Sequence, residues 1–263
     1  MRAPAPGPAV RRGPLVHLLL PLVLAGCAEA PEPVRVFAAA SLREAMEDAA
    51  AAWDGPVRVT SAGSQVLAHQ IAAGAPASVF APASEAHAEA VAERLDRVRP
   101  LACNALVLAV APSSDVQRFE DLPRASRLVL GTPEVPVGAY AETVLARAAA
   151  RFGDGWRRRV RARVVSREID ARQVLAKVTM GEADAALVYR TDAAAAGDAV
   201  RAVPIPEAIA VRPRYPVAVV SDGPAAADAA DFVRWLRAEE GFSHLAEHGF
   251  VRCAAGEDDD AAR

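Results

Sequence analysis

The chain has 263 residues, a hydrophobic content of 52% and a formal net charge of −3. This length exceeds one typical domain and predicts either two lobes or one large α/β domain with ample material for a core. The small net charge excludes a bulk electrostatic attraction to nucleic acid or to an anionic membrane surface.

The first 26 residues are predicted to be a targeting segment. Three arginines within the first 12 residues precede an apolar stretch, Leu15 to Leu24, which is too short to span a bilayer. The sequence Leu24-Ala25-Gly26-Cys27 then resembles the lipobox of bacterial lipoproteins. This resemblance implies cleavage before Cys27 and attachment of lipid to it, which would anchor the protein to a bacterial membrane. A plain secretory signal with an incidental cysteine is the alternative.

On either interpretation the mature chain works outside the cytoplasm. We expect residues 27–33 to be a tether and residues 254–263 to be an acidic disordered tail. Cys103 and Cys253 remain in a compartment that permits disulfides. A bridge between them is possible, but the sequence leaves open whether they come within bonding distance.

Short apolar strands alternate with helical patterns along the chain. The expected strands are residues 36–40, 57–60, 75–81, 101–110, 128–130, 160–165, 185–189 and 215–220. The expected helices are residues 42–52, 65–73, 84–95, 139–151, 171–180, 192–196 and 225–246. This alternation predicts an α/β fold with mostly parallel sheets and helices on both faces.

Several of these strands lead almost directly into a helix start. Ser41 follows the first strand, and Ser41 with Glu44 matches a capping box. Ser64, the turn Gly131–Gly138 and Asp170 mark three further helix starts. Unpaired N–H groups and the positive end of the helix dipole bind anions at such places. An ordinary strand-to-helix turn is the alternative for any one of them.

Other chemistries have weaker support. The chain lacks a Gly-x-Ser-x-Gly elbow, a phosphate-binding loop and a dinucleotide fingerprint, so we expect no enzyme and no cofactor. His244 and His248 have the spacing of a metal pair, but no second cluster accompanies them and we expect no bare metal ion. The arginine-rich residues 157–163 are not expected to be a nucleic-acid patch, because the alternation from Val160 onward fits an edge strand with one solvated face.

At the helix starts the chain resembles the periplasmic molybdate-binding proteins, the substrate-binding components of molybdate ABC importers. The matching stretches run in family order and cover nearly all of residues 34–251. They are Val36–Leu42, Ser64–Ile71, Ala73–Ala77, Gly131–Tyr140, Asp170–Arg172, Val188–Tyr189, Asp192–Ala193 and Tyr215–Val220.

The resemblance implies a two-lobed periplasmic-binding-protein fold that closes on molybdate or tungstate like a flytrap. Lobe 1 would contain residues 34–104 and 215–253, and lobe 2 residues 105–214. The implied oxyanion ligands are hydroxyls and backbone amides of Ser41, Ser64, Val137, Ala171 and Tyr189. The implied partner is the membrane permease of an ABC transporter, and the protein is expected to be a monomer.

Alternatives stay open at this point. The same fold could carry sulfate or phosphate, and a lipoprotein enzyme is a more distant alternative. Two features depart from the family pattern: Ser78 replaces a usual aspartate, and the turn Pro133–Pro136 is one residue shorter than in some members. We expect Ser41→Ala to weaken binding more than Tyr189→Phe, on the hypothesis that Tyr189 lies nearer the opening, where water could replace its hydroxyl.

Overall fold

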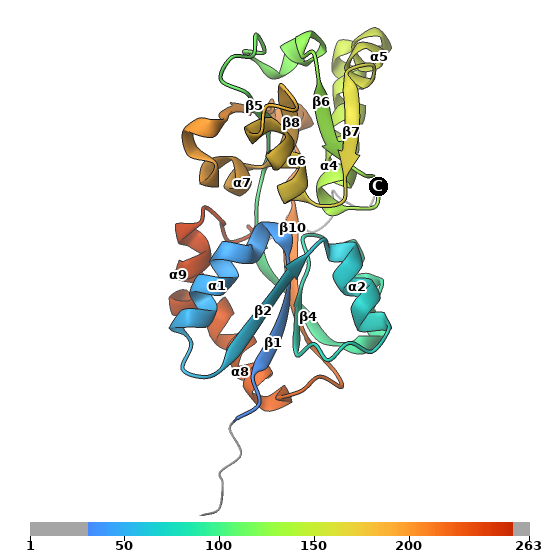
Figure 1. Cartoon of the computed structure of the whole chain (residues 1–263). Coiled ribbons are helices and arrows are strands. Elements are labelled where there is room, and N and C mark those ends of the chain that lie inside the picture. The colour runs from blue at the N-terminus through green and yellow to red at the C-terminus, as the bar shows by residue number, and fades with distance from the viewer. Residues whose placement is uncertain (1–30, 255–263) are drawn as a thin grey trace, which may run out of the picture. The chain divides into compact units, whose positions relative to one another are not determined.

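The computed structural model of the chain describes residues 31–254. The predicted leader, the proposed lipidation site at Cys27 and nearly all of the acidic tail lie outside the described residues. Among the residues described, no helix is long and apolar enough to cross a membrane. The described residues form two five-stranded sheets, each the centre of one lobe (Figure 1).

Lobe 1 is built on a sheet with the order β2-β1-β3-β10-β4. Its strands are β1 (Val34–Ala39), β2 (Val57–Ala62), β3 (Val79–Ala81), β4 (Leu95–Cys103) and β10 (Arg214–Val220). One face of the sheet is covered by α1 (Arg43–Ala52), α8 (Ala226–Arg237) and α9 (Glu239–Glu247), and the other by α2 (Ser64–Ala72) (Figure 1). The short helix α3 (Glu85–Glu89) contacts α2.

Lobe 2 repeats this arrangement with the order β7-β6-β8-β5-β9. Its strands are β5 (Leu106–Val110), β6 (Leu128–Gly131), β7 (Val164–Glu168), β8 (Ala185–Tyr189) and β9 (Arg201–Pro204). Its helices are α4 (Pro136–Phe152), α5 (Asp154–Arg161), α6 (Ala171–Thr179) and α7 (Arg190–Ala195). Both α4 and α6 pack against β6 and β8, which are fully buried as their continuous apolar sequences predict.

In each sheet four strands run in one direction and the fifth runs against them. The reversed strand is β10 in lobe 1 and β5 in lobe 2, because each pairs antiparallel with both of its neighbours. The remaining pairings are parallel. The predicted α/β, two-lobed fold with mostly parallel sheets is confirmed.

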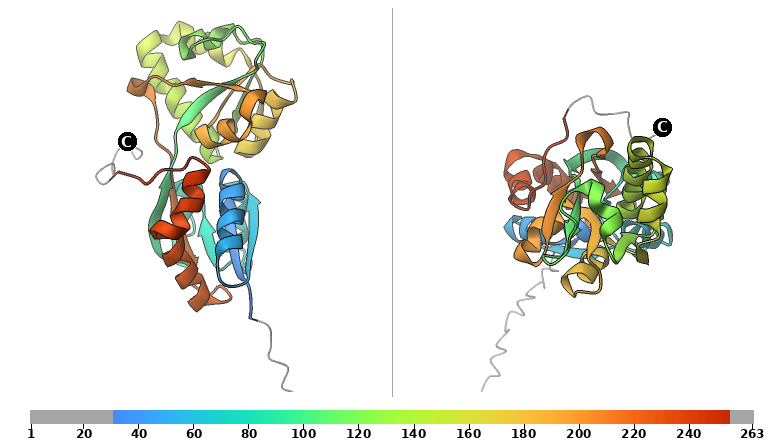
Figure 2. Two further views of the ribbon diagram at one scale, coloured as in Figure 1. Left: turned by 90° about the vertical axis from the view of Figure 1, so that its left-hand side faces the viewer. Right: turned by 90° about the horizontal axis from the view of Figure 1, so that it is seen from above.

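The reversed strands are the ones that follow each passage of the chain between the lobes. One passage lies between β4 and β5 and the other immediately precedes β10 (Figure 2). They are joined where the Asn104 amide donates to the Pro213 carbonyl at 3.0 Å. Two neighbouring backbone segments of this kind form a hinge that permits the lobes to rotate. The lobe boundaries near residues 104 and 215 stay a proposal.

A disulfide between Cys103 and Cys253 lies beside this hinge. The Cys103 amide also donates to the Val251 carbonyl at 2.7 Å, and Val251 donates back to Cys103. The C-terminal segment is therefore held against the end of β4. The pairing that the sequence left open is made in the structure.

Some of the predicted elements were wrong. The apolar run 101–110 is not one strand, because β4 ends at Cys103 and β5 begins at Leu106 in the other sheet. The helix predicted over 84–95 ends at Glu89, and β4 already starts at Leu95. The helix predicted over 225–246 is two helices, α8 and α9, that contact each other.

The arginine-rich segment also does not begin an edge strand at Val160, because β7 starts only at Val164. It forms most of α5, whose residues Trp156 and Val160 are buried while Arg158, Arg159 and Arg161 are exposed. Trp156 donates to the Glu120 carbonyl at 2.9 Å and its ring packs near Phe119. A helical spacing of four between the two buried residues accounts for the pattern better than the strand alternation that we predicted.

Candidate functional site

A small cavity lies between the two lobes, and all five residues that the resemblance assigned to an oxyanion line it. Lobe 1 and lobe 2 both contribute, so the cavity depends on how the lobes meet. The full lining consists of Ala39, Ala40, Ser41, Gly63, Ser64, Ala83, Val135, Pro136, Val137, Asp170, Ala171 and Tyr189. Segments up to 150 residues apart in the sequence, from Ala39 to Tyr189, are thus brought to one place.

Ser41 reaches this cavity from a short 3-10 helix, Ala40–Leu42, that separates β1 from α1. The predicted capping box is wrong, because α1 is capped by Leu42 without a side-chain hydrogen bond. Instead the Ser41 hydroxyl lies 3.0 Å from the hydroxyl of Tyr215, and the Glu44 carboxylate binds Arg172 of lobe 2. The extra turn rotates Ser41 away from the capping position and toward the cavity.

Ser64 is the first residue of α2, directly after the N-cap residue Gly63. The Ala83 amide donates to its hydroxyl oxygen at 3.0 Å. Ser64 is buried, with 2% of the residue exposed. Because the oxygen already accepts a bond from the protein, the single hydroxyl proton remains free for a ligand acceptor.

Lobe 2 contributes two helix starts. Val137 is the second residue of α4, after Pro136, and Ala171 is the first residue of α6. The first amides of a helix have no acceptor within that helix and carry the positive end of its dipole. Asp170 caps α6 as predicted, accepting from the Gln173 amide at 2.9 Å.

Glycine permits the close packing that shapes the lobe 2 wall. A β-carbon on Gly138 would lie only 1.9 Å from the carbonyl oxygen of Thr132. The start of α4 therefore lies directly on the preceding turn, which holds Val137 among the residues that line the cavity.

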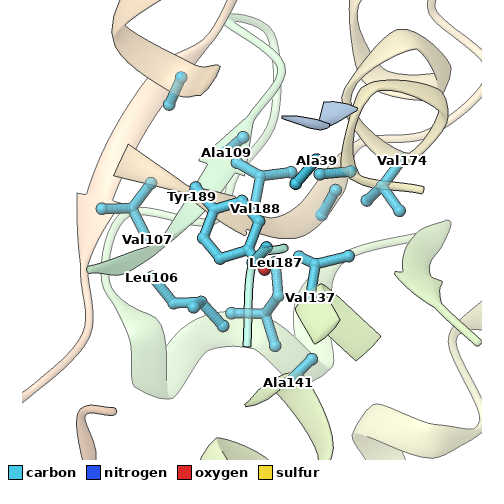
Figure 3. Close-up of a cluster of buried hydrophobic side chains, with 14 of the residues drawn as sticks. Ala39, Leu106, Val107, Ala109, Val137, Ala141, Val174, Leu187, Val188 and Tyr189 are labelled. Atoms are coloured by element: carbon cyan, nitrogen blue, oxygen red, sulfur yellow. The ribbon is translucent and has the colours of Figure 1, made fainter. Parts of the chain in front are cut away.

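Tyr189 ends β8 and lies between apolar side chains of both lobes, including Ala39 and Val137 (Figure 3). It is 1% exposed, and within residues 31–254 its buried hydroxyl has no hydrogen-bond partner. Leaving such a group unpaired costs about 1–3 kcal/mol. The hypothesis that Tyr189 lies near the opening, where water could replace its hydroxyl, is therefore wrong.

The electrostatics of the cavity depend on dipoles more than on charges. Asp170 is the only carboxylate among its lining residues, and no Lys or Arg lines it. The second Asp170 oxygen accepts from the Gln173 side chain at 2.8 Å, so both oxygens have donors. Burial raises the pKa of Tyr189 well above its usual value, which keeps its hydroxyl protonated. Neutral donors from four helix starts and one phenol can stabilise a buried anion without a cation.

Contacts between the lobes surround the cavity. The Gln65 side chain donates to the Ile169 carbonyl at 2.8 Å, and His87 contacts the Glu134 carbonyl at 3.2 Å. Arg172 donates to the Ala40 carbonyl at 2.9 Å and to the Glu44 carboxylate. These contacts hold the lobes together around the position that a ligand would occupy.

The sequence did not predict the residues that contact the lining residues without lining the cavity themselves. Tyr215 and Asn104 are buried, and Arg172 and Asp192 lie side by side on lobe 2 with a favourable charge interaction. Asp192, Arg172 and Tyr215 lay inside stretches that we matched to the family, but the pattern assigned them no role. His248 pairs with Asp48 at 2.7 Å, and among residues 31–254 no group of three metal-ligating side chains forms.

Two lobes of this topology, with a cavity between them and two chain connections joining them, define a solute-binding protein of the two-lobed extracytoplasmic class. The sequence profile described as "Bacterial extracellular solute-binding protein" matches residues 34–251. The chain belongs to this family.

Individual relatives extend this comparison. The molybdate-binding protein ModA of Escherichia coli is 34% identical over 251 residues, covering 88% of this chain and 94% of the relative. ModA of Mycobacterium tuberculosis is 34% identical over 239 residues, covering 87% and 88%. The periplasmic molybdate-binding protein of Azotobacter vinelandii shares the fold with a TM-score of 0.73 at 19% identity, covering 84% of this chain and all of that one (100%).

Proposed function

We propose that this protein captures molybdate or tungstate in the cavity between its lobes and delivers it to the permease of an ABC importer. The observation that carries the proposal is the buried Tyr189 hydroxyl, which has no partner within residues 31–254 and faces donors from both lobes. Ser41, Ser64, Val137 and Ala171 supply the other donors. The match to ModA proteins over nearly the whole mature chain supports the choice of anion.

The donor set suits a fully deprotonated tetrahedral dianion. Such an anion offers only acceptors, and the hydroxyls of Ser64 and Tyr189 each have a proton without a protein acceptor. Hydrogen phosphate also carries a proton that needs an acceptor. Asp170 is the one carboxylate in the cavity, but it is held as the N-cap of α6 by the Gln173 amide and side chain, and none of the five proposed ligands is acidic. Phosphate is therefore the poorer fit.

Sulfate differs from molybdate in size. Its oxygens lie closer to the central atom, so donors placed for molybdate would make longer and weaker hydrogen bonds to sulfate. Several stretched bonds to one buried anion add up to a large loss. We therefore expect strong discrimination against sulfate, and little between molybdate and tungstate.

The proposal includes a place and a partner. The protein would act on the outer side of a bacterial membrane, anchored through lipid on Cys27, as a monomeric carrier without catalytic activity. The cavity holds no nucleophile–base pair among its lining residues. Incorporation of labelled fatty acid in cells tests the anchor, and Cys27→Ser should abolish the labelling.

Calorimetric titration of the mature protein with molybdate, tungstate, sulfate and phosphate tests the function. We expect one molybdate or tungstate per chain, with sulfate and phosphate at least about 100-fold weaker, equivalent to about 2.7 kcal/mol. Equal affinity for sulfate would contradict the molybdate assignment while retaining an oxyanion carrier. Absence of binding for all four anions would contradict both.

A further inference from the structure

We propose that Tyr215 is a positioning residue for the anion, whose phenol donates to Ser41 and so directs the Ser41 proton into the cavity. Tyr215 does not line the cavity itself. The inference rests on the proposed function, because it assumes that the cavity binds an oxyanion. It assigns a role to β10, a strand of lobe 1 that contributes none of the five proposed anion ligands.

The position of Tyr215 is fixed on all sides. It lies on β10 with 0% exposure, and its hydroxyl is 3.0 Å from the Ser41 hydroxyl. Its ring packs edge-on against Tyr189 at 5.7 Å and Phe250 at 5.3 Å between centroids. The ring is therefore held in one place, with its hydroxyl at Ser41 and close to Asn104 and Tyr189.

The number of protons gives the bond its direction. Ser41 and Tyr215 each have one hydroxyl proton. An oxyanion only accepts hydrogen bonds, so Ser41 must donate its proton to the anion. The bond between the two hydroxyls then requires Tyr215 as donor and Ser41 as acceptor.

The second serine of the site has the same arrangement with a different donor. Ser64 accepts from the Ala83 amide at 3.0 Å, a bond whose direction is unambiguous because only the amide can donate. Both serines are thus acceptors toward the protein and have their protons left for the cavity. Tyr215 does for Ser41 what a backbone amide does for Ser64.

Tyr215 is suited to act as a permanent donor. Burial raises its pKa well above the usual value, although hydrogen bonds with Ser41 and Asn104 act in the opposite direction. Asn104 lies in the first connection between the lobes and also donates to Thr191 at 2.9 Å. The network behind Ser41 thereby extends to the hinge.

A double-mutant cycle in the full chain tests this role with molybdate as the probe. We expect Tyr215→Phe to weaken binding by about 3- to 10-fold, the effect of one net hydrogen bond. In a Ser41→Ala background the same substitution should change the affinity by less than about twofold. A structural defect would lower affinity equally in both backgrounds, and that result, or an unchanged affinity for Tyr215→Phe alone, would overturn the proposal.

A second measurement needs no substitution of Tyr215. The chain has three tyrosines, so protein labelled with ¹³C at the tyrosine ζ carbon gives three signals, assigned with Tyr140→Phe and Tyr189→Phe. Without anion, Ser41→Ala should shift the Tyr215 signal and leave that of Tyr140 unchanged. An unchanged Tyr215 signal would overturn the inference. If wild-type protein binds none of the four oxyanions, the proposed function fails, whereas binding without coupling defeats only the role of Tyr215.

Discussion

Arg172 of lobe 2 binds the carboxylate of Glu44 on lobe 1, and this pair bridges the two sides of the cavity. Arg172 directly follows Ala171, and its second hydrogen bond goes to the carbonyl of Ala40, the neighbour of Ser41. One side chain therefore links a proposed anion-binding residue of each lobe. A contact that forms only when the lobes meet stabilises the closed state and slows release of the ligand.

Arg172→Ala should weaken molybdate binding by about 3- to 10-fold, mainly through faster dissociation. The side chains of the pair are partly exposed, at 34% and 43%, so the two bonds of Arg172 together are expected to contribute about 0.7–1.4 kcal/mol. Stopped-flow displacement measures the dissociation rate. Arg161→Ala is the matched control, because it removes an ion pair within lobe 2, with Glu142, and should leave the rate unchanged. Equal dissociation rates for both variants would contradict the proposal that the Arg172–Glu44 pair stabilises the closed state.

Tyr189→Phe should reduce affinity about as strongly as Ser41→Ala, by roughly 10- to over 100-fold, because each removes a charge-assisted bond worth about 1.5–3 kcal/mol. This replaces the ranking expected from the sequence, since Tyr189 is more deeply buried than Ser41, at 1% against 7% exposure. Calorimetry of both variants decides the question. A loss below threefold for Tyr189→Phe would mean that its hydroxyl does not contact the anion.

Gly63→Ala should impair closure without lowering the stability of the unliganded protein. A β-carbon at this position would lie 2.8 Å from the Ile169 carbonyl oxygen in the opposite lobe. This distance is too short for two non-bonded atoms, and a backbone carbonyl cannot move aside as a side chain can. It would also meet the Gln65 side chain, which is flexible. We expect at least a tenfold loss of molybdate affinity by calorimetry. Gly155→Ala, where the nearest contact is a side chain at 3.6 Å, should bind normally.

Asp192 should make the folded protein less stable as the pH rises. Burial raises its pKa from 3.8 to about 7, although the charge of Arg172 acts in the opposite direction. Between these values the folded state holds a proton that the unfolded chain has lost, so stability falls as the pH increases from about 4 to 7. Thermal unfolding between pH 5 and 8.5 should show that the stability of Asp192→Asn relative to wild type rises from pH 5 to about 7 and then levels off. A constant difference across this range would contradict the assignment.

The disulfide should contribute about 2–4 kcal/mol to stability, because it connects residues 150 positions apart and restricts the unfolded chain. Cys103→Ser, Cys253→Ser and the double variant should unfold at equally reduced temperatures. Unfolding monitored by circular dichroism measures the effect, and reduced wild-type protein should match the variants. If the unfolding temperatures of the single variants differ markedly from that of the double variant, the loss of stability does not come from the disulfide alone.

The sequence by itself determined the alternation of strands and helices, and with it the fold class. The apolar runs of β6 and β8 and the polar starts of α2 and α6 are local features, and local patterns predict local structure. Five of the residues that line the cavity could also be named in advance, because the resemblance to the molybdate-binding family assigned them by motif position. The sequence predicted one strand over residues 101–110 and missed the break at Asn104. The end of β4 and the start of β5 are both buried and apolar, so composition does not separate them.

The tertiary structure alone decided what the side chains of these residues do. Glu44 was predicted to cap its own helix, yet it binds Arg172 from 128 positions away, because the 3-10 turn moves Ser41 out of the capping position. Tyr215 was known from the sequence only as the start of a strand, and the crossing at the hinge brings its hydroxyl to Ser41, 174 positions away. Direction of hydrogen bonds, burial of Tyr189 and the pKa of Asp192 depend on such distant neighbours. No local pattern encodes a neighbour that only the packing of two lobes supplies.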